Sequence, residues 1–202
     1  MIIGICGLIG SGKGTVADLL EQDYNFTKLS FADSLKDVVS ATFGWSRSML
    51  EGDTIESRKH REQVDTWWAT RLGIPQLTPR WILQHWGTEV CRVGFHDDIW
   101  IASMEHKLIN LPVGNYVIPD TRFPNEINMI RNISGKVWKV SRGLDPDWFT
   151  AYIKNDIIPA NIHPSEWMWA KSTFDQVICN NGTLNDLQLK IQTLLNTDAF
   201  NG

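Results

Sequence analysis

Apolar and polar positions along the chain follow two periodicities, one typical of buried strands and the other of amphipathic helices. Short apolar runs predict strands over residues 2–6, 25–29, 116–119, 135–141 and 174–179. Apolar residues that recur at helical spacing predict helices over residues 13–21, 30–43, 78–93, 100–111, 125–133 and 183–195. Because strands alternate with helices, the pattern predicts an α/β fold built on a parallel sheet.

Two stretches interrupt this alternation. Residues 46–77 are polar and rich in charge, and they contain Trp67 and Trp68, which indicates an insert or a loop with a helix. The tryptophan pair would suit a homodimer interface or an ordinary core contact. Residues 143–172 show no clear periodicity and hold several prolines, so we expect an irregular segment there.

A glycine-rich stretch joins the first predicted strand to the first predicted helix. Gly7, Gly12 and Lys13 match the G-x-x-x-x-G-K pattern of a phosphate-binding loop. In such a loop, backbone N–H groups surround phosphate oxygens, and the helix N-terminus and the lysine add positive charge. The alternative is a βα turn of a dinucleotide-binding fold. Lys13 within the loop and the lack of a G-x-G-x-x-G sequence argue against that alternative.

Polar residues near the loop and after two other predicted strands are candidates for phosphoryl chemistry. Gly14 stands where a Ser or Thr is usual, so Thr15, one residue later, is a candidate Mg²⁺ ligand either directly or through water. Asp120 follows a strand and is the second candidate Mg²⁺ ligand, with a turn-forming role as the alternative. Arg122 and Arg142 are candidates to stabilise a transferring phosphoryl group, or they are ordinary surface residues. Ligands of parallel sheets bind at the carboxyl ends of strands, where we expect these residues.

Composition narrows the class of protein. With 202 residues and 43% hydrophobic residues, the chain predicts one globular domain with small inserts. A net charge of -4 without a basic run argues against a nucleic-acid polymer as partner. Three widely spaced cysteines are expected to be free thiols in a reducing cytoplasm. We expect no membrane partner, because no apolar run approaches the roughly 20 residues that span a bilayer.

Two polar clusters lie between the first and third predicted strands. Arg61 belongs to a basic stretch over residues 58–62 that is either an acceptor-phosphate site or, more simply, a solvated helix face. A second set of residues is spaced by four along one predicted helix and would share one face, which would line a base-binding pocket together with Trp86 or belong to a plain amphipathic helix. That set is Arg80, Gln84, Thr88 and Arg92.

Taken in order along nearly the whole chain, these motifs resemble the bacteriophage deoxynucleoside monophosphate kinases. The segments that carry the resemblance are residues 7–15, 30–36, 58–62, 83–89 with Arg92, 97–100, 120–126 and 163–166. The Trp-Gly-Thr-Glu and Asp-x-Arg-Phe-x-Asn-Glu sequences within them are the most specific.

The resemblance implies a P-loop kinase three-layer fold with a five-stranded parallel sheet and two inserts. In this interpretation the single domain has a core of residues 1–29, 95–142 and 173–202, a monophosphate-binding part at about 30–94 and a lid at about 143–172. The implied reaction transfers phosphate directly from ATP to a deoxynucleoside monophosphate, with Mg²⁺, in the cytoplasm of a host cell.

The resemblance also assigns residues by motif. The loop residues Gly10, Ser11, Gly12, Lys13, Gly14 and Thr15 would hold ATP. Lys13, Asp120, Arg122 and Arg142 would act on the transferring phosphoryl group. The acceptor would contact Phe31, Asp33, Lys36, Arg61, Arg80, Gln84, Trp86, Thr88, Arg92 and Glu166.

Three other functions remain open at this level. Another P-loop kinase of small molecules, similar to dephospho-coenzyme A kinase or phosphomevalonate kinase, would share the loop but need a different acceptor pocket. A nucleotide-dependent switch or ATPase usually has Ser or Thr directly after the lysine, and Gly14 argues against it. A DNA-binding accessory protein is disfavoured by the net charge of -4.

Overall fold

The computed structural model describes residues 1–200. Contacts divide the chain into two compact units. The sheet unit comprises Met1–Ser30 and Pro112–Gly202, and the helical unit comprises Phe31–Leu111. The segment 95–111, which we assigned to the core from sequence, therefore lies in the helical unit.

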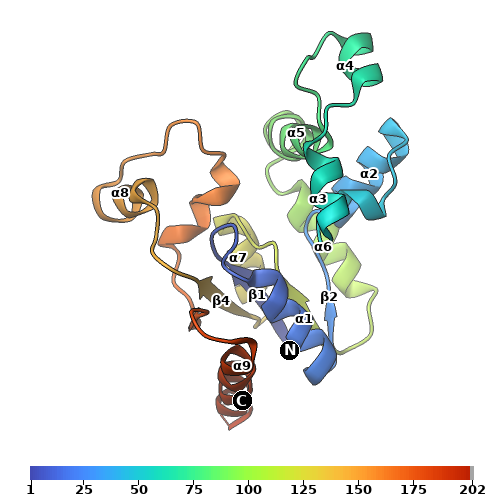
Figure 1. The fold of residues 1–202 in the computed structure, drawn as a ribbon. Coiled ribbons are helices and arrows are strands. Elements are labelled where there is room, and N and C mark those ends of the chain that lie inside the picture. The colour runs from blue at the N-terminus through green and yellow to red at the C-terminus, as the bar shows by residue number, and fades with distance from the viewer. Residues whose placement is uncertain (201–202) are drawn as a thin grey trace. The chain divides into compact units, whose positions relative to one another are not determined.

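The sheet unit is built on five parallel strands, as expected (Figure 1). The strands are β1 (Ile2–Cys6), β2 (Phe26–Lys28), β3 (Asn115–Ile118), β4 (Lys136–Ser141) and β5 (Gln176–Cys179). Their order in the sheet is β2-β3-β1-β4-β5, so β1 lies at the centre and its carboxyl end leads into the glycine-rich loop. In register, Gly4 of β1 pairs with Ile118 of β3 and Val137 of β4.

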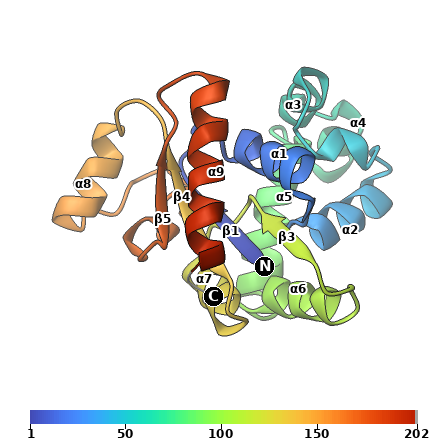
Figure 2. The same cartoon turned by 90° about the horizontal axis from the view of Figure 1, so that it is seen from below.

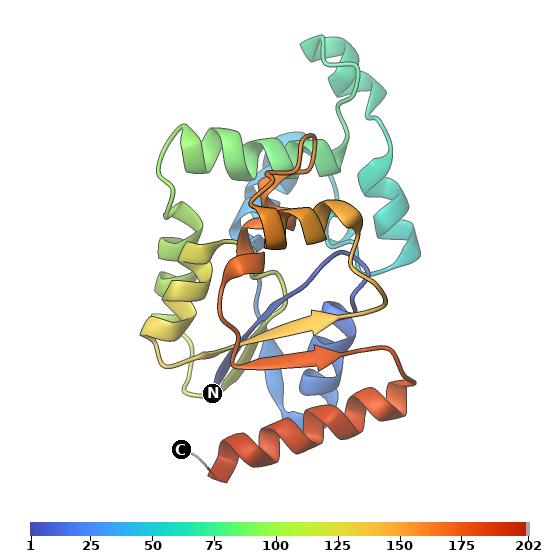
Figure 3. The same ribbon diagram turned by 90° about the vertical axis from the view of Figure 1, so that its left-hand side faces the viewer.

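Helices cover both faces of this sheet, which gives three layers (Figures 2 and 3). One face packs on α1 (Lys13–Tyr24) and α9 (Leu184–Phe200). The other face packs on α7 (Pro124–Asn132), and Figure 3 shows α8 (Asp147–Asn155) on that same side. Gly4 permits the close approach of α7, because a Cβ there would lie 2.4 Å from Ile130 Cδ1.

The core between the sheet, α1 and α9 is continuous and apolar. Alternate strand residues such as Ile3, Ile5, Trp138 and Val140 point toward these helices and are fully buried, as a strand period of two requires. Full burial of such side chains contributes about 1.5–3 kcal/mol each. This core fixes the strand ends that carry the polar residues.

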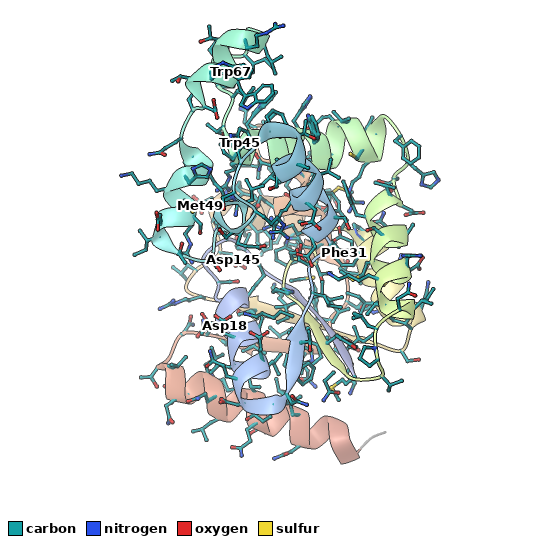
Figure 4. All side chains as sticks on the ribbon, turned by 90° about the vertical axis from the view of Figure 1, so that its right-hand side faces the viewer. Asp18, Phe31, Trp45, Met49, Trp67 and Asp145 are labelled. Carbon is teal, nitrogen blue, oxygen red and sulfur yellow. The ribbon has the colours of Figure 1, made fainter. Side chains whose placement is uncertain are left out.

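The helical unit has its own apolar core. Its elements are α2 (Asp33–Phe43), η1 (Ser48–Leu50), α3 (Ile55–Glu62), α4 (Thr66–Leu72), α5 (Pro79–His85), η2 (Trp86–Val93) and α6 (Ile99–Ile109). Helix α5 begins as predicted: the Thr78 hydroxyl accepts a hydrogen bond from Trp81 N at 3.1 Å, and Pro79 takes the first position. Trp45 and Trp67 are labelled in Figure 4, and Trp45 is buried whereas Trp67 on α4 is 63% exposed.

The two interrupted stretches contain more regular structure than the sequence pattern predicts. Residues 46–77 hold η1, α3 and α4, and residues 143–172 hold α8 and two short turns, η3 (Pro164–Glu166) and η4 (Met168–Lys171). Helix α8 was not predicted because prolines flank it and its nine residues are too few for a clear period. Among residues 1–200, none of the helices combines the length and the apolar character needed to cross a membrane.

Candidate functional site

The glycine-rich loop between β1 and α1 is folded so tightly that two of its glycines have no room for a side chain. A Cβ on Gly7 would lie 2.4 Å from the carbonyl oxygen of Val140. A Cβ on Gly12, whose φ is +101°, would lie 2.2 Å from Asn180 Nδ2. The Asn180 amide donates to the carbonyl oxygen of Ser11 at 3.0 Å and so fixes the loop against the turn after β5. The loop is therefore a preformed part of the sheet unit.

Lys13 begins α1 and its side chain lies over the loop. Its Nζ donates hydrogen bonds to the carbonyl oxygens of Gly7 at 2.8 Å and Leu8 at 2.9 Å. Burial is the main cause that lowers the pKa of Lys13 to about 8, and repulsion from Arg122 adds to it, while Glu166 acts in the opposite direction. A cation held partly out of water at a helix N-terminus is a strong binding group for phosphate.

The loop fits a polyphosphate in two further respects. Gly10 and Gly14 have open space around their Cα atoms, since a Cβ on either would meet no heavy atom within 4 Å. The Oγ of Ser11 is buried and makes no hydrogen bond to any described residue. An unsatisfied buried hydroxyl costs about 1–3 kcal/mol, a cost that a nearby acceptor oxygen would remove.

Asp120 lies just beyond the end of β3, and its carboxylate is hydrogen-bonded to the segment that follows β2. The Ser30 hydroxyl donates to Asp120 Oδ2 at 2.6 Å, so the ends of β2 and β3 are linked there. Next to it, the Thr121 hydroxyl donates to the carbonyl oxygen of Ile118 at 3.1 Å and closes the turn. Asp120 is half-buried, and Thr15 on α1 is exposed.

Mg²⁺ in kinase sites is usually held by one or two protein oxygens together with phosphate oxygens and water. The Asp120 carboxylate and the Thr15 hydroxyl are ligands of that kind. The part of the chain that the structure describes holds no cluster of three or more His, Cys, Asp or Glu side chains suited to a metal. A carboxylate and a hydroxyl of this kind suit a cation that is shared with phosphate oxygens.

Arg122 is fixed by two acidic residues. Its Nη1 donates to Glu166 Oε1 at 2.6 Å, which joins the turn after β3 to η3. Its backbone N donates to Glu126 Oε2 at 2.6 Å, and the N of Phe123 donates to the same oxygen at 3.1 Å. Glu126 is buried and caps the first turn of α7 in this way. Glu126 thus accounts structurally for the acidic end of the Asp-x-Arg-Phe-x-Asn-Glu motif.

Arg142 occupies the other predicted strand end. It follows β4 directly, is exposed, and has no hydrogen bond or ion pair within the described part of the chain. The structure thus places Lys13, Asp120, Arg122 and Arg142 in the sheet unit, three of them with defined partners.

The segment after β4 is attached to the sheet by aromatic packing. The Lys139 ammonium lies 5.7 Å from the ring centre of Phe149, 6.0 Å from that of Trp169 and 5.9 Å from that of Phe174. Phe149 and Trp169 are almost fully buried. These contacts anchor α8 and η4 on β4.

In the helical unit, the predicted acceptor residues Asp33 and Lys36 belong to a network of charges. Asp33 pairs with Lys107 at 2.8 Å and with Arg47 at 3.3 Å. Lys36 pairs with Glu51 at 2.6 Å, and its side chain is only 12% exposed. Phe31, which precedes the network, is buried.

The basic stretch 58–62 is folded onto the turn after η1 and is not simply a solvated helix face. Arg58 donates to the carbonyl oxygens of Gly52 at 2.9 Å and Asp53 at 3.1 Å. Arg61 donates to the carbonyl oxygen of Glu51 at 3.1 Å. Arg80 on α5 pairs with the exposed Glu62 at 2.7 Å.

The helix that carries the residues spaced by four changes its geometry partway along. The helix changes to π geometry at Trp86, with hydrogen bonds from Gly94 N to the Glu89 oxygen and from His96 N to the Cys91 oxygen, both of 3.0 Å. Four residues are slightly more than one α turn and slightly fewer than one π turn, so the two opposite drifts keep this spacing near one side of the helix. Arg80, Gln84, Trp86 and Thr88 are half-buried, whereas Arg92 is buried and donates to the Asp97 carbonyl oxygen at 3.0 Å.

Four residues with defined roles in these geometries were not singled out from the sequence. Asn180 donates a hydrogen bond to the loop, and Ser30 donates one to Asp120. Arg47 and Glu51 belong to the network of ion pairs that includes Lys36. Ser30 stands inside a recognised motif, which is a usable signal. Asn180 is distant in sequence from the loop it binds, so no local pattern indicates it.

Two viral proteins are similar to this chain over 95% of its length. No family model matches. A protein of Acanthamoeba polyphaga mimivirus, provisionally named a deoxynucleotide monophosphate kinase, is 29% identical over 204 residues, covering 95% of this chain and 94% of its own. The deoxynucleoside-5'-monophosphate kinase of Escherichia phage T5 is 24% identical over 253 residues, with the same coverage of 95% and 94%.

Among solved structures, a shikimate kinase from Aquifex aeolicus aligns over 100% of both chains with 14% identity and a TM-score of 0.46. A dephospho-CoA kinase from Campylobacter jejuni aligns over 97% of this chain and 96% of its own, with 13% identity and a TM-score of 0.43. The resemblance indicated by the motifs is confirmed: over 95% of its length, the chain is similar to viral proteins named as deoxynucleoside monophosphate kinases.

Proposed function

We propose that the chain is a kinase that transfers the γ-phosphoryl group of ATP to a deoxynucleoside monophosphate. The observation that carries the proposal is the glycine-rich loop, in which Lys13 Nζ lies 2.8 Å and 2.9 Å from two loop carbonyl oxygens at the start of α1. The similarity over 95% of the chain to two proteins with that name supports this choice of substrate class.

The loop residues would bind the donor. The N–H groups of residues 10–15 and the Lys13 ammonium would contact the β- and γ-phosphates of ATP. Asp120 and Thr15 would hold Mg²⁺, directly or through water, and the bound ion would neutralise charge on the phosphate oxygens.

Two arginines would act on the transferring group. Arg122 is already oriented by Glu166 and by the backbone contact to Glu126, so its guanidinium needs little reordering to contact phosphate oxygens. Arg142 is exposed and unpaired within the described residues, which leaves all of its donors available. Glu166, which the motif assigned to the acceptor, is better explained as the residue that positions Arg122.

The helical unit would bind the acceptor. Lys36 and Arg61 are the candidates for its phosphate, and the half-buried Trp86 offers apolar surface for the base or sugar. Phe31, whose side chain is buried, would border the acceptor. The remaining candidates from the motif are Asp33, Arg80, Gln84, Thr88 and Arg92. Residues 30–94 would thus be the monophosphate-binding part, and residues 143–172 a lid over ATP.

The chemistry requires no covalent intermediate. Direct transfer needs the acceptor oxygen and the γ-phosphorus aligned, with the charge on the phosphoryl oxygens neutralised. Water must also be excluded, because it would otherwise compete as acceptor. Lys13, Arg122 and Arg142, together with Mg²⁺, would neutralise the charge on the phosphoryl oxygens. Closure of the acceptor-binding part and of the lid would exclude water.

The proposal is tested by looking for the product itself. The protein is incubated with ATP, Mg²⁺ and each deoxynucleoside monophosphate in turn, and the nucleotides are separated by chromatography. Formation of the diphosphate with equimolar ADP is expected for the unaltered protein and for Lys190→Met, an exposed lysine on α9. Folded protein that forms no diphosphate from any acceptor would exclude the proposed function.

A further inference from the structure

In the helical unit, each carboxylate oxygen of Glu51 forms an ion pair with a different basic side chain. Lys36 Nζ lies 2.6 Å from Oε2, and Arg47 Nη1 contacts Oε1. Arg61 adds a third positive side chain beside the same residue, since its Nη1 donates to the main-chain oxygen of Glu51 at 3.1 Å. Three basic residues from α2, the turn before η1 and α3 therefore meet at one acidic residue.

This arrangement of donors suits a phosphoryl group as well as a carboxylate. Both anions present two or more oxygens to a lysine and an arginine, and both form short charge-assisted hydrogen bonds. A phosphate monoester carries close to two negative charges near neutral pH and would neutralise the cations more completely than one carboxylate does.

The Lys36 side chain is less exposed to solvent than the Glu51 side chain, so its charge depends more strongly on a partner of opposite sign. The Lys36 side chain is 12% exposed, so its ammonium has lost most of its water and depends on a negative partner. The Glu51 side chain is 35% exposed, so its carboxylate is more accessible to solvent than the Lys36 ammonium. An anion from solvent can therefore compete with this carboxylate for Lys36.

Arg47 is held in place independently of Glu51. Its Nε donates to Asp37 Oδ1 at 2.6 Å, and its Nη2 lies 3.3 Å from Asp33 Oδ1. Only Nη1 is used for Glu51. If Glu51 leaves, the guanidinium keeps its orientation and presents Nη1 to whatever anion replaces the carboxylate.

We propose that Glu51 is an internal competitor for the acceptor's phosphate and that Arg47 is a further phosphate-binding residue. Glu51 binds Lys36 and Arg47 until the phosphate of the acceptor takes its place. The identity of the ligand rests on the proposed function, but the competition itself rests only on the geometry within the helical unit.

The proposal predicts that removing the charge of Glu51 strengthens phosphate binding. Binding of inorganic phosphate, and separately of each deoxynucleoside monophosphate, is measured by calorimetry on the full chain without ATP. We expect Glu51→Gln to lower the dissociation constant about fivefold or more, the lower range for two ligands coupled at one site. Glu56→Gln makes the same change in net charge at an exposed position of α3 and should leave the constant unchanged.

A purely structural role for Glu51 gives the opposite result. If Glu51 only braces Lys36 and Arg47, then folded Glu51→Gln protein binds phosphate equally or more weakly, and the proposal is overturned. Glu51→Asp provides a second variant in case Glu51→Gln does not fold. It keeps the charge but shortens the reach by one methylene, so tighter phosphate binding is again expected, and weaker or equal binding again overturns the proposal.

The two proposals fail separately. Tighter phosphate binding by Glu51→Gln without diphosphate formation in any assay would leave the competition standing and exclude the kinase. Diphosphate formation by the unaltered protein, with phosphate binding unchanged in Glu51→Gln, would support the kinase function and exclude competition by Glu51.

Discussion

Arg122 donates to Glu166 at 2.6 Å, which joins two residues that are 44 positions apart in the sequence. Arg122 follows β3, and Glu166 ends η3 in the segment expected to form the lid. The pair therefore connects the sheet edge that carries Asp120 to the segment after β4, and it places a negative charge that partly offsets the repulsion between Arg122 and Lys13.

Loss of this ion pair should weaken the sheet unit and slow the reaction. We expect Glu166→Gln to lower the free energy of unfolding by about 1 kcal/mol, because the pair is only half-buried and solvent screens it. We also expect kcat to fall more than KM for the acceptor rises, since Arg122 would be less well oriented. Denaturant unfolding and steady-state kinetics check both. A large rise in KM for the acceptor with unchanged kcat would instead indicate that Glu166 contacts the acceptor.

Lys13 should be required for activity but not for stability. We expect Lys13→Met to reduce kcat at least about a hundredfold, the usual effect of removing a main electrostatic contact to the transferring group. Burial lowers the pKa of Lys13 to about 8, which means that the charged form is disfavoured in the folded state. The melting temperature of Lys13→Met should therefore equal or exceed that of the unaltered protein near neutral pH. A folded variant with normal turnover would contradict the site assignment.

Gly12 and Gly10 provide a matched test of the loop. Both have positive φ, but a Cβ on Gly12 would lie 2.2 Å from Asn180 Nδ2, whereas one on Gly10 would meet nothing within 4 Å. We expect Gly10→Ala to cost about 1 kcal/mol from backbone strain alone. Gly12→Ala should cost more, because Asn180 must also move, and it should abolish ATP binding. Equal costs in thermal unfolding would show that the Asn180 contact does not constrain the loop.

Asp65 should stabilise the helical unit in a pH-dependent way. Its carboxylate caps α4 through Trp68 N at 3.1 Å and accepts from Trp45 Nε1 at 2.8 Å. Burial acts to raise the pKa of Asp65, but these hydrogen bonds outweigh it and hold the pKa below the usual 3.8. The stabilisation is therefore fully present above pH 3.8 and is lost as the pH falls through the lower pKa of the folded state.

The measurement for this pH dependence compares the unaltered protein with Asp65→Ala. At neutral pH the variant should be less stable by about 2 kcal/mol, since it loses a helix cap and leaves a buried indole N–H without its acceptor. The difference should shrink in acid, when Asp65 is protonated in both states. Unfolding of both proteins is followed by tryptophan fluorescence. A difference in stability between them that stays constant down to pH 2–3 would contradict this role.

The parallel sheet was predictable because its strands are short apolar runs, each bounded by a turn, and because the glycine-rich loop fixes the order strand, loop, helix. The helix that begins at Thr78 was predictable from its cap and from Pro79. Its conversion to π geometry at Trp86 was not, since the apolar pattern of residues 86–93 suits either kind of helix. Helix α8 was missed because prolines flank its nine residues, and the packing of Phe149 beside Trp169 and Lys139 is a set of contacts that only the fold creates.

The candidate site was predictable where one residue type at a fixed spacing carries the chemistry, as for Lys13 in the loop. It was less predictable where the partner is distant in sequence. Asn180 against Ser11 and Ser30 against Asp120 are contacts that only the folded sheet creates. The pairing of Lys36 with Glu51 likewise depends on the turn after η1, whose charges appear in the sequence as an ordinary polar stretch.

Phosphoryl transfer to a deoxynucleoside monophosphate is the reaction proposed for this chain. The most direct test is the rate of ADP release from ATP and Mg²⁺ without an acceptor and with dGMP, dTMP, dCMP, dAMP, the ribonucleotide counterparts or dephospho-coenzyme A. We predict fast release with one or more deoxynucleotides and little release without an acceptor. Equal release with and without acceptor would contradict the account in favour of an ATPase, and release with dephospho-coenzyme A alone would contradict the proposed substrate class.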